Sequence, residues 1–100
     1  MDNQFLRTQM LLGGDAMNQL HRSHVAVFGL GGVGSYAAEA LVRSGVGELT
    51  LIDDDTVSPT NLNRQLEALH STVGQNKTDA LAARCRDINP DAVSYTHLRA

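Results

Sequence analysis

The sequence lacks several features that would assign it to other classes of protein. It has a single cysteine, Cys85, which excludes an internal disulfide framework and a metal site built on several thiolates. No apolar run approaches the ~18 residues that a transmembrane helix requires, and the N-terminus lacks the apolar core of a signal peptide. We therefore expect a protein of the reducing cytoplasm that has no membrane segment.

Positive charge is also scarce. Eight lysines and arginines stand against eleven aspartates and glutamates, the formal net charge is −3, and Lys77 is the only lysine. A general electrostatic footprint on nucleic acid is not indicated, because such binding needs many cations on one face. The hydrophobic fraction of 42% is sufficient for one packed domain in 100 residues.

Short apolar segments alternate with helical patterns along the chain. Residues 24–28 are predicted to form a buried strand and residues 49–52 a second strand. Helices are predicted over residues 33–45 and 78–88, and a third strand is expected to begin near residue 93. This order predicts the N-terminal half of a Rossmann-like α/β domain, with three parallel strands and two covering helices.

The apolar spacing also predicts which helix faces are buried. A short N-terminal helix, capped by Asp15, is expected to end near His21. Residues 56–75 are expected to form a loop with at most a short helix. The predicted buried positions of the three helices are Ala16, Met17 and Leu20 in the first, Val33, Ala37, Ala40 and Leu41 in the second, and Leu81, Cys85 and Ile88 in the third.

A glycine-rich turn follows the first predicted strand. Gly29, Gly31, Gly32 and Gly34 satisfy the pattern G-x-G-x-x-G between a strand and a helix. Glycines at these positions allow a tight turn and let backbone N–H groups approach a phosphate at the start of the helix. The alternative is a glycine-rich turn without a ligand, but the strand–turn–helix context favours a nucleotide site.

An acidic residue ends the second predicted strand. Asp53 follows Gly34 by 19 residues, where a carboxylate in a dinucleotide-binding fold accepts hydrogen bonds from a ribose hydroxyl. Up to this point an NAD-dependent oxidoreductase remains a full alternative. Asn61, Arg64 and Lys77 weaken it, because two cations beside a glycine-rich turn suit the outer phosphates of a triphosphate better than a dinucleotide.

Four motifs together resemble the ubiquitin-activating-enzyme-like (ThiF/MoeB/HesA) superfamily, over residues 5 to about 91. They are the glycine turn at residues 29–34, the acidic run at residues 53–55, the segment Thr60-Asn61-Leu62-Asn63-Arg64-Gln65, and Gly74-Gln75-Asn76-Lys77. The resemblance implies a Rossmann-like fold that binds ATP rather than NAD and adenylates a carboxylate. It also implies that Mg²⁺ accompanies the nucleotide.

The resemblance further implies roles for individual residues. Gly32 would contact the nucleotide phosphates, Asp53 the ribose, and Asn61, Arg64 and Lys77 the triphosphate. The remaining nucleotide-binding candidates are Gly29, Gly31, Gly34 and Asp55. Arg7 aligns with an N-terminal arginine that reaches the phosphates in relatives, in some of them from the partner subunit, and Arg7, Arg64 and Lys77 are therefore the catalytic candidates.

Within the superfamily, two segments resemble the branch of tRNA threonylcarbamoyladenosine dehydratases. They are residues 7–17 and residues 32–45, the second of which contains Glu39 and Arg43. The implied partner is tRNA, and the implied assembly of the full-length protein is a homodimer. The alternatives are an adenylyltransferase for a ubiquitin-like sulfur carrier and, more remotely, an NAD-binding oxidoreductase module.

Family members are well over twice as long as this chain. Residues 1–100 are therefore expected to be the N-terminal part of a ThiF-type nucleotide-binding domain and to be inactive alone. Residues from about 93 to 100 do not follow the family pattern clearly.

Overall fold

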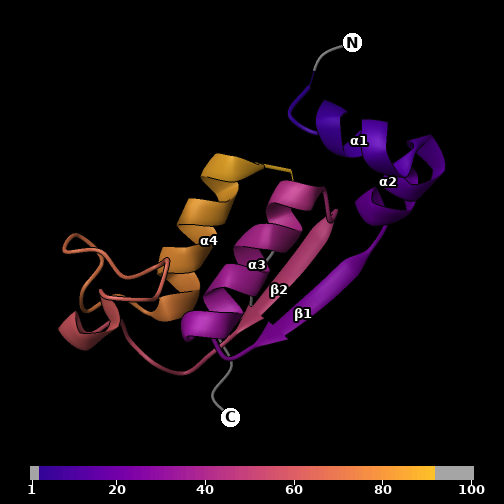
Figure 1. Cartoon of the computed structure of the whole chain (residues 1–100). Helices are drawn as coiled ribbons and strands as arrows, with labels where there is room; N and C mark the ends of the chain where they lie inside the picture. The colour runs from indigo at the N-terminus through magenta and orange to yellow at the C-terminus, as the bar shows by residue number, and fades with distance from the viewer. Residues whose placement is uncertain (1–2, 92–100) are drawn as a thin grey trace.

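The computed structural model describes residues 3–91, in which two parallel strands are packed against two long helices (Figure 1). The predicted third strand and the question of residues 93–100 lie outside these residues. None of the four α-helices in residues 3–91 has the length and hydropathy of a membrane span. The elements in chain order are α1 (Leu6–Leu12), α2 (Gly14–His21), β1 (His24–Phe28), α3 (Gly32–Ser44), β2 (Glu48–Ile52), the 3₁₀-helix η1 (Pro59–Asn61) and α4 (Lys77–Ile88).

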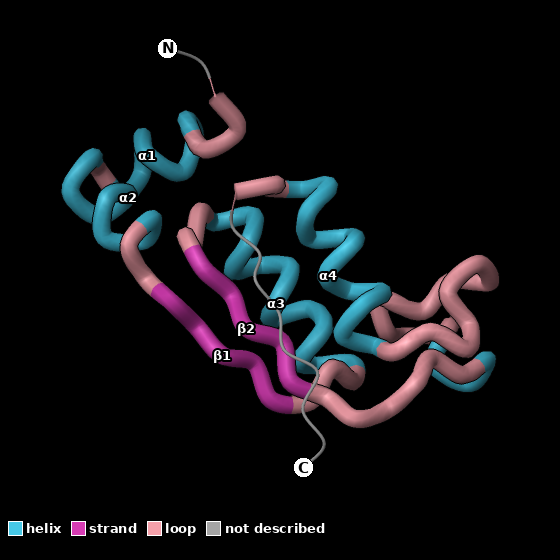
Figure 2. The backbone as a smooth tube through the Cα atoms, turned by 180° about the vertical axis from the view of Figure 1, so that it is seen from behind, coloured by secondary structure: helices cyan, strands magenta, loops and turns pink. Residues whose placement is uncertain are grey.

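The two strands pair in parallel, as predicted. The register runs from His24 opposite Glu48 to Phe28 opposite Ile52, and α3 forms the crossover between the strands. Seen from behind, β1 lies at one side of the layer, and α3 and α4 lie across one face of the sheet (Figure 2). The alternation of strands and helices in the sequence is therefore sufficient to predict this architecture.

The prediction that β1 is a buried strand is wrong in part. Val25 and Val27 are half-buried against the core, whereas Phe28 on the opposite face is 76% exposed. Successive side chains of a strand point to opposite faces of its sheet. Only one face is covered by helices within residues 3–91, so only alternate residues of β1 reach the core.

The hydrophobic core lies between the sheet and the two long helices. Its buried residues come from β2, α3, α4 and the glycine turn, and they are Leu30, Ala38, Val42, Leu49, Leu51, Leu81, Ala82 and Cys85. Burial raises the pKa of the Cys85 thiol to about 11, so the thiol stays protonated and unreactive at neutral pH. The predicted buried face of the last helix is confirmed for Leu81 and Cys85, and Ile88 is half-buried.

The predicted buried face of α3 is wrong for three of its four residues, and only Leu41 packs against the core. The buried residues of this helix are Ser35, Ala38 and Val42, whereas Val33 is 86% exposed. Ala37 and Ala40 are also exposed, and Leu41 is half-buried. A hydrogen bond explains the buried serine, because the Ser35 hydroxyl accepts the Leu66 N–H at 3.3 Å. The buried stripe therefore lies one or two positions further along the helix than the apolar spacing predicts.

The N-terminal segment forms two helices at the amino ends of the strands (Figure 1). α1 was not predicted as a helix, and none of its seven residues is buried. α2 buries Met17 as predicted, but it begins at Gly14 with Gly13 as its N-cap, so Asp15 lies in the first turn and does not cap it. Its last residue, His21, anchors the segment through Nδ1, which lies 2.8 Å from the Gly45 carbonyl oxygen.

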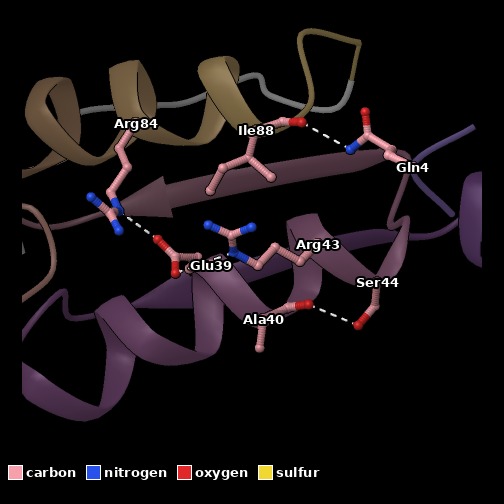
Figure 3. A network of polar contacts seen from close by, with 7 residues as sticks. All are labelled: Gln4, Glu39, Ala40, Arg43, Ser44, Arg84 and Ile88. Atoms are coloured by element: carbon pink, nitrogen blue, oxygen red, sulfur yellow. Dashed lines mark hydrogen bonds and ion pairs between the residues drawn. The ribbon is translucent and has the colours of Figure 1, made fainter. Parts of the chain in front are cut away.

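Glu39 joins α3 to α4 (Figure 3). Its carboxylate accepts a hydrogen bond from Arg84 of α4 and forms an ion pair with Arg43 of its own helix at 3.3 Å. The Glu39 side chain is only 15% exposed. Burial opposes ionisation of this carboxyl, but the hydrogen bonds and charges of Arg84 and Arg43 outweigh it and lower its pKa.

We predict that Glu39→Gln lowers the free energy of unfolding by about 1 kcal/mol near pH 7, because both arginines lose their charged acceptor. A carboxyl whose pKa is lowered on folding stabilises the fold above its unfolded pKa, and this contribution disappears as the pH falls through the folded pKa. Urea unfolding followed by circular dichroism should therefore show that the free energies of unfolding of the wild type and of Glu39→Gln become equal in acid. Asp87→Asn, which removes an exposed carboxylate from α4, is the control, and a difference that persists unchanged in acid would contradict the prediction.

Candidate functional site

The predicted site residues lie mostly at the carboxyl ends of the two strands. β1 leads into the glycine turn and α3, and β2 leads into the acidic run. The loop of residues 53–76 returns to this end of the sheet before α4 begins, so the N-termini of α3 and α4 point to the same side (Figure 1). In open parallel sheets, ligands bind at this edge.

Two glycines of the turn are required by the packing of the chain itself. Gly29 has a φ of +85°, which favours glycine, and its N–H donates to the Ile52 carbonyl at 2.8 Å. A Cβ placed on Gly34 would lie 1.8 Å from the Gly29 carbonyl oxygen. A side chain is therefore strained at Gly29 and sterically impossible at Gly34 without a shift of the backbone.

The other two glycines are not required in this way. A Cβ on Gly32 would meet the Arg64 side chain at 3.7 Å, and one on Gly31 would meet the Gln65 amide at 3.9 Å, both of which are ordinary contacts. The first N–H groups of a helix have no partner within the helix, and they attract anions. The fold therefore does not require glycine at residues 31 and 32, and the start of α3 beside them is a candidate site for a phosphate.

Asp53 fastens the acidic run to the glycine turn. Its Oδ2 accepts the Leu30 N–H at 2.6 Å, and its Oδ1 accepts the Asp55 N–H at 2.7 Å. Each carboxylate oxygen retains a further lone pair that can accept a hydroxyl. The position of Asp53 at the end of β2, beside the glycine turn, is the one that the sequence predicted for a ribose ligand.

The acidic run also provides a cluster of carboxylates. One oxygen from each of Asp53, Asp54 and Asp55 lies within 4.8 Å of the others. Two of these residues already have partners, because Asp53 accepts backbone N–H groups and Asp55 faces Lys77. We assign no metal to this cluster.

Arg64 reaches the glycine turn from the loop. Its aliphatic stem lies over Gly32, and its guanidinium is held by the Thr60 carbonyl at 3.1 Å and by the Asn63 side-chain oxygen at 2.9 Å. Both partners are neutral, so the positive charge is not compensated by either of them. The remaining guanidinium donors are suited to a phosphate.

Lys77 is the first residue of α4 and is buried. Its Nζ lies 3.9 Å from Asp55 Oδ2, and its N–H donates to the Asp55 carbonyl at 3.0 Å. An antiparallel bridge between Thr56 and Asn76 holds the two ends of the loop together. Lys77 is thereby brought next to the acidic run, although the two are more than twenty residues apart in sequence.

Unlike Arg64 and Lys77, the candidate residues Asn61 and Arg7 are not placed beside the glycine turn or the acidic run by a contact within residues 3–91. The buried side chain of Asn61 accepts the Ser58 N–H at 2.8 Å and completes a capping box at η1, so its visible role is to shape the loop. Arg7 lies on α1, at the amino ends of the strands, and the structure does not bring it together with the glycine turn within one chain. For both residues, a contact with phosphate stays a prediction.

One residue at the site was not found from the sequence. Glu67 is 1% exposed, and neither of its carboxylate oxygens has a hydrogen-bond partner among residues 3–91. Burial is the main cause that raises its pKa to about 7. Contact with its own backbone N–H and the charge of Lys77 lower the pKa, and the charge of Asp53 raises it further. A glutamate in a polar loop is ordinarily solvated, so no signal in the sequence distinguished this one.

Comparison with known proteins identifies relatives of this chain. It is 56% identical over 91 residues to the tRNA threonylcarbamoyladenosine dehydratase of Bacillus subtilis, an alignment that spans 91% of this chain and 36% of the relative. It is 43% identical over 94 residues to the molybdopterin-synthase adenylyltransferase of Escherichia coli, spanning 89% and 38% respectively. The chain thus covers little more than a third of the length of these curated relatives.

Solved structures agree with the sequence comparison. The crystal structure of the Escherichia coli dehydratase TcdA in complex with ATP matches with a TM-score of 0.90 and 47% identity, over 93% of this chain and 39% of that one. The same enzyme has been crystallised with AMP. The family model described as "ThiF family" matches residues 4–99, and with almost the whole chain matched, this chain belongs to the ThiF family.

Proposed function

We propose that the protein uses ATP to adenylate a carboxylate, and that the carboxylate is that of threonylcarbamoyladenosine in tRNA, which is then dehydrated to its cyclic form. The observation that supports the ATP part is that Arg64 lies against Gly32 of the glycine turn and that Lys77 lies beside Asp55, both at the carboxyl ends of the strands. The similarity to dehydratases, at 56% identity for the Bacillus subtilis enzyme, supports the tRNA substrate.

The proposed reaction has two steps. A carboxylate oxygen attacks the α-phosphorus of ATP, pyrophosphate leaves, and an acyl adenylate forms. Ring closure onto the activated acyl carbon then expels AMP. In this scheme the N–H groups of the glycine turn, Arg64 and Lys77 hold and neutralise the phosphates, and Asp53 orients the ribose. These residues contribute position and electrostatic stabilisation rather than proton transfer.

Several further features belong to the proposal. ATP enters with Mg²⁺, because a divalent cation neutralises charge between the phosphates, and no ligand in this chain is assigned to it. The full-length protein is a cytoplasmic homodimer, and Arg7 reaches the nucleotide of the partner subunit. The chain is the N-terminal part of a ThiF-type nucleotide-binding domain, which the family match over residues 4–99 supports.

A second candidate keeps the ATP site and changes the acceptor. The 43% identity to the molybdopterin-synthase adenylyltransferase favours a ubiquitin-like sulfur carrier as the source of the carboxylate. Release of pyrophosphate in the presence of modified tRNA or of carrier protein separates the two candidates. None of the relatives named above is an oxidoreductase, so the NAD alternative has no support from them.

The glycine turn allows a prediction with a matched pair of variants. Gly32→Ala should leave the melting temperature unchanged or slightly higher, because alanine favours a first helical turn, yet it should weaken ATP binding by crowding the phosphate. Gly34→Ala should destabilise the protein by more than about 3 kcal/mol, because its Cβ would overlap a backbone carbonyl. Thermal melting and ATP titration of the full gene product that carries this chain measure both effects. Equal stability of the two variants would contradict this division of roles.

Arg64 allows a prediction about nucleotide choice. If its guanidinium holds an outer phosphate, Arg64→Ala should weaken ATP binding by about 1.5–3 kcal/mol, because a charge-assisted hydrogen bond is lost. AMP affinity should be almost unchanged, because AMP lacks the outer phosphates. Calorimetric titration of the full gene product with both nucleotides measures the two losses.

Asp53→Ala is the matched control for this experiment. It removes a proposed ribose ligand and the acceptor of the Leu30 N–H, so it should weaken ATP and AMP equally. Equal losses of ATP and AMP in Arg64→Ala would place that arginine away from the outer phosphates. NAD binding that is tighter than ATP binding would overturn the proposed function.

A further inference from the structure

Glu67 is a buried carboxyl group whose position the proposed reaction does not explain. It is 1% exposed, and neither carboxylate oxygen has a hydrogen-bond partner in the described part of the chain. Its backbone, by contrast, is well held, because the Thr72 hydroxyl donates to the Glu67 carbonyl at 2.6 Å. A buried carboxyl group that has no donor beyond its own backbone N–H is costly and calls for an explanation.

The surroundings of Glu67 link it to the nucleotide site. The charged groups that act on it are Lys77, at the start of α4, and Asp53, at the end of β2. Lys77 also faces Asp55, at 3.9 Å, and its side chain is only 8% exposed. The Lys77 ammonium therefore forms an ion pair with Asp55 and acts on Glu67 through its charge, while Asp53 adds a second negative charge near Glu67.

A bound triphosphate changes this balance. Its charge adds to those of Asp53 and Asp55, and it attracts the Lys77 ammonium that otherwise compensates Glu67. Both effects favour the neutral form of a buried carboxyl. Because burial has already raised the pKa of Glu67 to about 7, this change in charge alters its protonation near neutral pH.

We propose that Glu67 is a positioning residue for Lys77, and that it takes up a proton when ATP binds so that the ammonium can turn from Glu67 to the phosphates. This inference rests on the proposed function, since it requires that ATP binds beside Lys77. In the ionised form Glu67 competes with the phosphates for Lys77. When Glu67 is protonated, it no longer attracts the Lys77 ammonium, and the site binds ATP more tightly.

The sign of the pH dependence follows from linkage. If binding takes up a proton, ATP affinity falls as the pH rises through the pKa of Glu67 in the free protein. Each unit by which ATP raises that pKa changes the affinity by up to about tenfold across the transition. The charged groups that act on Glu67 are Lys77, whose charge favours the ionised carboxylate, and Asp53, whose charge opposes it.

The experiment is calorimetric titration of the full gene product that carries this chain with Mg²⁺–ATP, near pH 7, in two buffers of different ionisation enthalpy. The difference in heat gives the number of protons taken up. We expect a substantial fraction of one proton per ATP in the wild type and a dissociation constant that weakens several-fold, toward about tenfold, between pH 6 and 8. In Glu67→Gln we expect no uptake by the protein and an affinity that is nearly independent of pH.

Asp87→Asn is the matched control, because it removes an exposed carboxylate from α4 and leaves Glu67 in place. Asp87→Asn should show the same proton uptake as the wild type. The part of the measured uptake that comes from the ionisation of ATP itself is the same for both proteins. A stability measurement supports the comparison: since the pKa of Glu67 is raised on folding, the wild type should lose stability relative to Glu67→Gln as the pH rises from 6 to 8.

The outcomes are separable. Tight ATP binding without proton uptake by the wild type overturns the inference and leaves the proposed function intact, whether or not Glu67→Gln folds. Equal uptake in the wild type and Glu67→Gln also overturns it, because the proton would then bind elsewhere. Failure of the wild type to bind ATP overturns the proposed function and the inference with it.

Discussion

The carboxylate of Asp53 is the constraint on which the rest of the site depends. By accepting one N–H from the glycine turn and one from the acidic run, it fastens the end of β2 to the segment that follows β1. Asp55 is thereby oriented so that its carbonyl accepts the N–H of Lys77 and its carboxylate faces the ammonium of the same residue. Three segments far apart in sequence meet through a short series of hydrogen bonds that begins at one side chain.

The charges around this point are unevenly compensated. Arg64 is exposed and is held by two neutral oxygen atoms, so its charge is available to a ligand. Lys77 is buried among acidic groups, and Glu67 is buried without a donor. Such an arrangement is poorly balanced in the free protein, and a nucleotide with its own negative charge would redistribute the interactions of the two cations. Strongly perturbed groups of this kind often mark functional sites.

The glycines of the turn divide into two pairs with different physical reasons. Gly29 and Gly34 satisfy the geometry of the chain, through a positive φ and a close approach between backbones. Gly31 and Gly32 would each tolerate a Cβ, so the fold does not require a glycine at either position. The motif G-x-G-x-x-G therefore contains a folding requirement at two of its glycines, and the proposed function adds a binding requirement at the other two; the sequence pattern by itself does not separate them.

Local patterns were sufficient to predict β1, α3, β2 and α4, although not α1, and to select candidate site residues. The apolar runs and glycine breaks determined two parallel strands with the crossover helix α3, and the spacing of the motifs singled out Asp53, Arg64 and Lys77, because parallel strands bring their carboxyl ends to one edge. Tertiary structure decided what depends on neighbours distant in sequence. Ser35 is buried because Leu66 supplies its donor, and Phe28 is exposed because no helix in residues 3–91 covers its face of the sheet. Glu67 became a perturbed acid only because the loop folds it inward beside Lys77, and burial of a single polar side chain has no periodic signal in a sequence.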